Sequence, residues 1–162
     1  MKEKTESLKP LIVAVSGYFD PLHIGHLELF GRAKSLGDFL VVIVNNDEQV
    51  KLKRNGKEPF MKQEDRVHLI EAIGFVDKVV LSIDKDNSVC ETLKLLKPDI
   101  FAQGGDRYFE EVPETSACNE IGIKMVQGLG AKIRASSEII GKMEEYDNQN
   151  INIEEYKSDE KN

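Results

Sequence analysis

The chain has 162 residues, and 22 Lys and Arg against 29 Asp and Glu give it a formal net charge of −7. A chain of this length can bury the core of one ordinary domain without disulfides or structural metal ions. The acidic total argues against a protein that coats nucleic acid, which is normally basic. It leaves open a small phosphorylated ligand, because such a ligand is bound by local charge.

The negative charge is concentrated near the C-terminus. Residues 142–162 hold three Lys and seven acidic residues, a net charge of −4, and they show no apolar periodicity. This composition is typical of a solvated extension. We therefore predict an N-terminal extension over residues 1–10, a single domain over 11–143 and an acidic, flexible tail over 144–162.

The sequence patterns favour a cytoplasmic protein. No apolar run approaches the ~18 residues of a membrane span, and the charged N-terminus lacks the apolar segment of a secretory signal. Cys90 and Cys118 lack the CxxC or Cys/His spacing of a metal or redox site, so we expect reduced, buried thiols.

Continuous apolar runs predict the strands. Such runs, in place of alternating ones, are typical of parallel strands that are covered on both faces. The predicted strands are 11–15, 39–44, 78–81, 98–102 and, with a weaker pattern, 124–126.

Between these runs, apolar residues recur at helical spacing. Three such segments lie at 27–33, 67–73 and 89–96, each followed by a Gly or Pro that ends a helix, and a last helix is expected from about Ser136. Strands that alternate with helices predict the α/β class, as a single doubly wound domain with a parallel sheet.

In such a sheet the ligand lies beyond the carboxyl ends of the strands, where the strand order reverses. The segments 16–20, 45–47 and 103–107 each follow a predicted strand and are polar or rich in glycine. Ordinary turn chemistry explains any one of them. Three together favour a binding site.

The sharpest motif is SGYFDPLHIGH at residues 16–26. His23 and His26 are three apart, so on a first helical turn they project to one side, and Gly25 leaves room for a phosphate at the helix N-terminus. The pair at 20–21, Asp-Pro, suits a helix start, although the helix could begin a few residues later. Two imidazoles at this position suit the stabilisation of negative charge on a phosphorus centre.

Other interpretations of the histidine pair are a zinc site and a purely structural pair. A zinc site would need a third ligand, and no Cys or acidic residue has a supporting spacing. The motifs GxxxxGK[ST] and GxGxxG are absent, which disfavours a P-loop kinase and a dinucleotide-binding dehydrogenase.

The motif resembles the GxFDxxHxGH signature of the cytidylyltransferase-like nucleotidyltransferases, the HxGH superfamily. The similarity extends from about Ile12 to Met143 and includes the stretch RAKSLGDFLVVIVNND. It continues in the basic loop, E-x-R helix and V-D-x-V strand of QVKLKRNGKEPFMKQEDRVHLIEAIGFVDKVV. The turn AQGGDR resembles the form found in heptose-phosphate adenylyltransferases. The pattern is closest to that type and to glycerol-3-phosphate cytidylyltransferases.

The resemblance implies a Rossmann-like nucleotidyltransferase fold and a defined reaction. A nucleoside monophosphate passes from ATP or CTP, bound with Mg²⁺, to a small phosphorylated acceptor such as a sugar phosphate or alditol phosphate, and pyrophosphate leaves. It also implies a homodimer. Two alternatives stay open: a cofactor-precursor adenylyltransferase of the FMN or phosphopantetheine type, and a non-catalytic nucleotide sensor.

The resemblance also assigns roles to individual positions. His23, His26 and Lys51 would be catalytic, and Lys51 and Arg66 would bind the acceptor. The residues that would bind the nucleotide are Ser16, Gly17, Tyr18, Phe19, Asp20, Gly25, Gly104, Asp106, Arg107, Ser136 and Ser137.

Lys51 belongs to a cluster of four cations within seven residues, with Lys53, Arg54 and Lys57. A solvated loop is the usual interpretation of such a charge run, but this one follows a strand end on the expected ligand side. Lys51 matches the phosphate-binding lysine of the family, and we expect the other three to be exposed until substrate binds. Arg66 would either hold the acceptor phosphate or pair with a helix neighbour.

The second family motif, a turn rich in Ser and Thr, reads KIRASSEII at residues 132–140. Ser136 and Ser137 suit contacts to phosphates at a helix N-terminus, or simple capping of that helix. Ala135 stands where the family often has Ser or Thr, and the role of Arg134 stays open.

Overall fold

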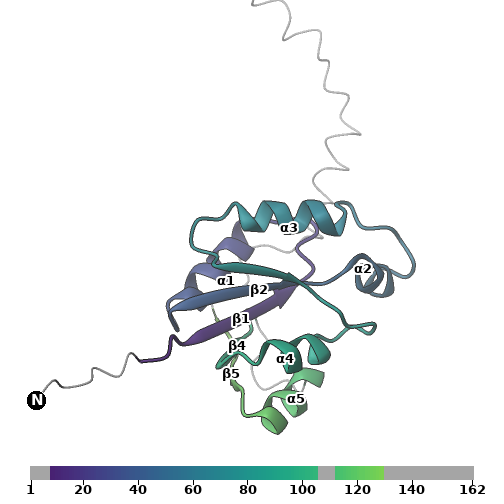
Figure 1. Cartoon of the computed structure of the whole chain (residues 1–162). Coiled ribbons are helices and arrows are strands. Elements are labelled where there is room, and N and C mark those ends of the chain that lie inside the picture. The colour runs from purple at the N-terminus through teal and green to yellow at the C-terminus, as the bar shows by residue number, and fades with distance from the viewer. Residues whose placement is uncertain (1–7, 106–111, 130–162) are drawn as a thin grey trace, which may run out of the picture.

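The computed structural model describes residues 8–105 and 112–129 of the chain. Its centre is a five-stranded parallel sheet with the order β3-β2-β1-β4-β5 (Figure 1). The strands are β1 (Ile12–Gly17), β2 (Phe39–Val44), β3 (Lys78–Leu81), β4 (Ile100–Ala102) and β5 (Lys124–Val126). The predicted α/β class and parallel sheet are confirmed.

The strand order reverses between β1 and β4, because the chain first builds outward to β3 and then returns to the other side of β1. This reversal point is where a doubly wound sheet opens a crevice for a ligand. The loops that follow β1 and β4 are therefore the first place to look for a site.

Helices cover both faces of the sheet. They are α1 (Ile24–Lys34), α2 (Asp47–Lys53), α3 (Gln63–Glu71), α4 (Cys90–Leu96) and α5 (Pro113–Ile121). Phe30 of α1 and Ile70 of α3 pack in one core cluster, whereas Leu93 of α4 and Cys118 of α5 pack in the other. Side chains of β1 alternate between the two clusters, as the pleat of a strand requires.

Two of these helices were not predicted. The basic run was expected to be a loop, but it is helical through Lys53, which corrects that prediction. Asn46 caps α2, because its side chain accepts from the Gln49 N–H while the Gln49 side chain accepts from the Asn46 N–H. This reciprocal cap replaces the apolar periodicity that a seven-residue helix is too short to show.

α5 has Pro113 at its first turn, which is a common helix start. Cys118 of this helix is buried, and burial raises the pKa of its thiol to about 11. Cys90 is half-buried and burial likewise raises the pKa of its thiol. Both cysteines are free thiols, in agreement with the sequence.

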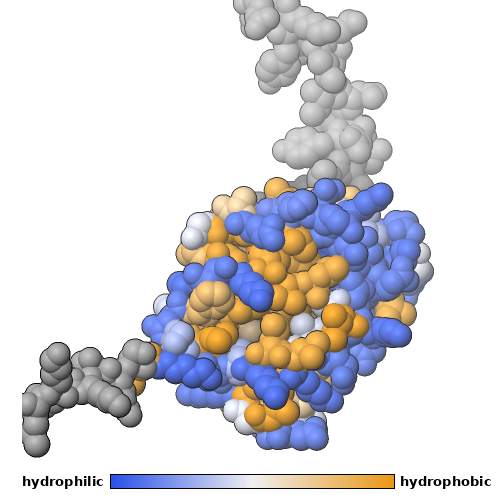
Figure 2. All heavy atoms as spheres, viewed as in Figure 1, coloured by the Kyte–Doolittle hydropathy of each residue, from blue (hydrophilic) through white to orange (hydrophobic). Residues whose placement is uncertain are grey.

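Figure 2 shows hydrophobic residues gathered on one face of the molecule, between α3 and α4, where β3 forms the edge of the sheet. Within the described residues, no helix is both long and apolar enough to cross a bilayer. The cytoplasmic location and the boundaries at residues 10 and 143 stay predictions. The expected helix from Ser136 and the acidic tail lie outside the described residues.

Candidate functional site

The two motif histidines form the N-terminus of α1. His23 is the N-cap, so α1 begins after it, and the Asp-Pro pair at 20–21 does not start the helix. The His23 Nδ1 accepts the Gly25 N–H at 3.1 Å, and the His26 Nδ1 accepts the His23 N–H at 3.2 Å. The N–H groups of Gly25 and His26 are thus bonded to His23, through its side chain and its carbonyl oxygen respectively.

These bonds fix the chemistry of both rings. An Nδ1 that accepts a hydrogen bond carries no proton, so each neutral ring bears its proton on Nε2 and presents a donor there. The rings stack with centroids 3.7 Å apart and planes inclined by 23°. As the spacing predicted, the two histidines lie on one side of the helix. This helix follows β1, one of the two strands between which the strand order reverses.

His26 is held neutral. Burial, followed by the charges of His23 and Lys53, lowers the pKa of His26 from 6.5 to about 3. A neutral imidazole with its proton on Nε2 stabilises an anion as a hydrogen-bond donor. It does so without presenting a second full positive charge beside Lys53.

The Phe19 ring packs against the His26 ring. Phe19 is buried with a positive φ of 52°, and its ring meets His26 edge-on at 4.9 Å and Phe30 at 5.1 Å. A Cβ at Gly17 would stand 2.7 Å from two carbons of the Phe19 ring. Glycine at position 17 therefore makes room for this ring.

Lys51 and Lys53 leave α2 in different directions. At 3.6 residues per turn, side chains two positions apart point about 200° away from each other. Lys53 Nζ lies 4.1 Å from the centroid of the Tyr18 ring, and its charge reaches His26. Lys51 instead pairs with Glu48 and Glu58, each at 3.1 Å, and hydrogen bonds to these two carboxylates raise the pKa of Lys51. Lys53 is thus the cation beside the histidines.

Arg66 lies in an internal network. Its side chain is fully buried, and its guanidinium donates to the carbonyl oxygens of Met61, Tyr18 and Asn45 and to the Asp47 carboxylate. These partners do not lie on the helix of Arg66, as one expectation had it. They come from the residues that follow β1 and β2, from the start of α2 and from the segment before α3. Arg66 joins these segments to α3.

Asp20 is the second anchor of the same region. Its buried carboxylate accepts the N–H groups of Phe60 at 2.9 Å and Met61 at 2.8 Å, with Arg54 Nη1 3.7 Å away. Arg54 also packs over the Phe60 ring at 3.9 Å, so it is held in place, contrary to the expectation that it would be exposed. Asp20 thus ties the segment between α2 and α3 to the histidine loop.

The remaining predicted residues divide into two groups. Ser16 is half-buried at the end of β1, and Gly104 follows β4, where a Cβ would stand 2.9 Å from the Leu29 side chain. Tyr18 lies under Lys53, and Lys57 is exposed. The others lie outside the described residues: Asp106, Arg107, Arg134, Ser136 and Ser137.

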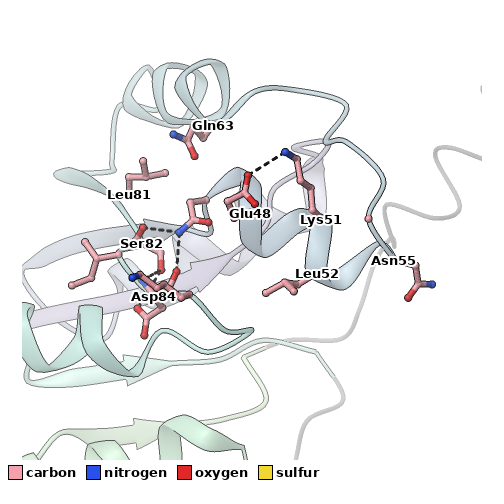
Figure 3. Close-up of a pocket in the computed structure, with 12 residues that line it drawn as sticks. Glu48, Lys51, Leu52, Asn55, Gln63, Leu81, Ser82 and Asp84 are labelled. Atoms are coloured by element: carbon pink, nitrogen blue, oxygen red, sulfur yellow. Dashed lines mark hydrogen bonds and ion pairs between the residues drawn. The ribbon is translucent and has the colours of Figure 1, made fainter.

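A groove, which the sequence did not predict, lies on the Lys51 side of α2 (Figure 3). This groove of about 910 Å³ runs between α2, α3 and the residues that follow β3. It is lined by Asn46, Glu48, Lys51, Leu52, Asn55, Gly56, Gln63, Leu81, Ser82, Ile83, Asp84 and Lys85. The available signal was Ile83, an apolar residue among polar ones just after a strand.

Within residues 8–105 and 112–129, no group of three or more His, Cys, Asp or Glu side chains could hold a metal ion.

The chain is similar to several curated proteins and to solved structures. FAD synthase of Pyrococcus abyssi is 43% identical over 113 residues, which cover 70% of this chain and 75% of that protein. Bifunctional protein HldE of Nitratiruptor sp. is 39% identical over 110 residues, which cover 68% of this chain and 23% of HldE. The structure of a lipopolysaccharide core biosynthesis protein from Thermoplasma volcanium has a TM-score of 0.62 at 35% identity, over 74% of this chain and 96% of that one.

Residues 14–151 match the family described as Cytidylyltransferase-like, which is most of the chain. This match, the relatives and the fold agree with the HxGH signature at the end of β1. The chain is a nucleotidyltransferase and belongs to the cytidylyltransferase-like family.

Proposed function

We propose that this chain transfers AMP from ATP to FMN and releases pyrophosphate. The observation that carries the transfer chemistry is the stacked pair His23 and His26, with both Nδ1 atoms occupied, beside Lys53. The acceptor is supported by relatives named FAD synthase. The match to the Pyrococcus abyssi protein covers three quarters of that protein's length. The choice replaces the sugar phosphate that the AQGGDR turn favoured.

In this mechanism an oxygen of the FMN phosphate attacks the α-phosphorus of ATP in line. The new P–O bond forms as the bond to the β-phosphate oxygen breaks, and pyrophosphate leaves. The Nε2–H groups of His23 and His26 donate to the phosphate oxygens as charge builds on them, and Lys53 balances that charge. Mg²⁺ enters with ATP as part of the substrate. The protein acts by positioning and charge stabilisation, without a covalent intermediate.

A sugar phosphate is the second candidate acceptor. The AQGGDR turn and the match to HldE favour it, although this chain spans only 23% of HldE. A homodimer stays an expectation, which the molar mass in solution would check.

The test is a direct assay of the full chain with Mg²⁺ and ATP. FMN, a heptose phosphate, glycerol 3-phosphate and phosphopantetheine are offered separately, and both pyrophosphate and the nucleotidyl product are measured. We expect FAD from FMN, and turnover about 10²–10³-fold lower in His26→Ala. Pyrophosphate release with another acceptor but not with FMN would contradict FMN as the acceptor. No pyrophosphate release with any of the acceptors would favour a non-catalytic nucleotide sensor.

A further inference from the structure

We propose that the groove on the Lys51 side of α2 binds the isoalloxazine ring of the flavin acceptor, an inference that rests on the proposed function. Its apolar contacts would come from Leu52, Leu81 and Ile83. Leu52 and Ile83 are 53% and 55% exposed, and both line this one groove. A volume of about 910 Å³ lies within the range of small-molecule sites.

The polar side chains on the inner wall of the groove, those of Asn46, Gln63 and Asp84, are already bonded within the protein. The Asn46 side-chain amide donates to the Ser82 and Asp84 carbonyl oxygens, and its oxygen accepts the Gln49 N–H (Figure 3). The Gln63 side chain accepts the Asp47 N–H and donates to Glu64.

The buried Asp84 carboxylate is similarly occupied. It accepts the Glu91 and Thr92 N–H groups and the hydroxyls of Ser82 and Thr92. A sugar in the groove would have to break such bonds to satisfy its hydroxyls, at a cost in free energy. The dimethylbenzene side of the flat isoalloxazine ring gains contact with Leu52 and Ile83 without that cost, and its polar pyrimidine edge would face the open side of the groove.

The walls of the groove are fixed before any ligand arrives. Gln49 is fully buried, and its side-chain amide donates to the Asp86 and Ser88 carbonyl oxygens at 2.7 and 2.8 Å. With Asn46, it fastens the segment after β3 to α2. A preformed groove loses less entropy when a rigid ring binds.

The position of the groove relative to the histidines also selects an acceptor. Lys51 of α2 lines the groove, and Lys53 of α2 lies beside His26, so the helix stands between the two sites. An acceptor that uses both needs a chain between its bulky group and its phosphate. In FMN the ribityl chain joins the isoalloxazine ring to the phosphate, whereas a sugar 1-phosphate carries its phosphate directly on the ring.

The experiment compares the full-length chain with the double variant Leu52→Gln, Ile83→Gln. The matched control is Leu95→Gln, because Leu95 is 71% exposed on α4 and outside the groove. Riboflavin, which has the ring but no phosphate, is the binding probe and is followed by its fluorescence anisotropy. The KM values for FMN and ATP are measured in parallel, and melting temperatures check folding, with the single variants as a second set.

We expect the double variant to raise the KM for FMN and weaken riboflavin binding about tenfold or more, given the apolar area lost. The KM of the double variant for ATP should stay unchanged. Leu95→Gln should keep the wild-type KM for FMN and the wild-type affinity for riboflavin. If the chain makes FAD but the double variant leaves the KM for FMN unchanged, the groove assignment is overturned and the proposed function stands. If FMN is not a substrate, but riboflavin binds and the variant weakens that binding, the proposed function fails and the groove assignment stands. No riboflavin binding to the wild-type chain overturns the assignment.

Discussion

The fold strongly alters the protonation of His26, since burial, followed by the proximity of His23 and Lys53, lowers its pKa to about 3. The unfolded chain binds a proton at His26 near pH 6.5, but the folded chain does not until about pH 3. Stability from this group is therefore complete above pH 6.5 and is lost as the pH falls from there toward 3.

The prediction is that the His26 ring resonance shows no titration between pH 7 and about pH 4, in line with that pKa. His26→Asn assigns the resonance. In urea unfolding, the stability advantage of the wild-type chain over His26→Asn should shrink as the pH falls through this window. An advantage that stays constant with pH would contradict the lowered pKa.

The two lysines of α2 give a second prediction at this scale. Lys53 lies over the Tyr18 ring and acts on His26, whereas Lys51 pairs with Glu48 and Glu58. We expect Lys53→Met to lower kcat/KM for ATP by about 10²-fold, and Lys51→Met to change it only a few-fold. Both variants keep an apolar stem, so the comparison isolates the charge. A greater loss in Lys51→Met would restore the assignment made from the family motif.

At the scale of residues, the sequence predicts what spacing decides and does not predict the direction in which a side chain points. The three-residue spacing of His23 and His26 was enough to place them together. Which of Lys51 and Lys53 points toward the histidines depends on their positions around the axis of α2. The sequence was expected to form a loop there, so these directions could not be predicted. Asp20 was expected to bind the nucleotide, and Arg66 to hold the acceptor phosphate or pair with a helix neighbour. A charged side chain gives no sign in the sequence that it will be buried among backbone groups.

Among the structural elements, the connection between α2 and α3 is held by two charged side chains. Met61 is bonded from both sides, because its N–H is accepted by Asp20 and its carbonyl oxygen accepts from Arg66. This connection begins one residue after Lys53 and runs past the histidine loop. It therefore sets the position of the basic end of α2 relative to the site.

Asp20→Asn tests this connection. An amide offers one acceptor oxygen in place of two, so either Phe60 or Met61 loses its partner for a buried N–H. We expect a loss of about 1–3 kcal/mol in the free energy of unfolding. Asp65→Asn, at an exposed position of α3, should stay within about 0.5 kcal/mol of wild type. A variant of normal stability with weakened ATP binding would instead return Asp20 to the nucleotide site.

Elements with long apolar patterns were the ones that could be predicted. β1 and β2 are six-residue strands, of which β1 is buried at its centre and β2 along nearly all of its length, and their apolar runs were visible in the sequence. α2 is held by the reciprocal cap of Asn46 and Gln49, and Gln49 is buried although it is polar. Periodicity of apolar residues does not detect such a helix. The groove was missed for the same reason, since α2 forms one of its walls.

For the whole molecule, the net charge of −7 works against a triphosphate ligand, and the fold compensates locally. Lys53 and the Nε2 donors of the two histidines lie at the strand-order reversal, and α1 has no acidic residue in its first turn. Local positive potential at a helix N-terminus outweighs distant, screened carboxylates. An acidic protein can therefore bind ATP and still be unsuited to coat nucleic acid.

The choice of base is a property of the whole folded chain, and thermal stabilisation measures it without knowledge of the acceptor. A ligand at about 100 times its Kd adds about 2.7 kcal/mol to the free energy of unfolding. For a chain of this size each kcal/mol raises Tm by roughly 2–4 °C. We expect ATP with Mg²⁺ to raise Tm by several degrees and CTP with Mg²⁺ to raise it clearly less, with Mg²⁺ alone as the control. A larger rise with CTP would contradict AMP transfer and favour a cytidylyltransferase, whatever acceptor occupies the groove.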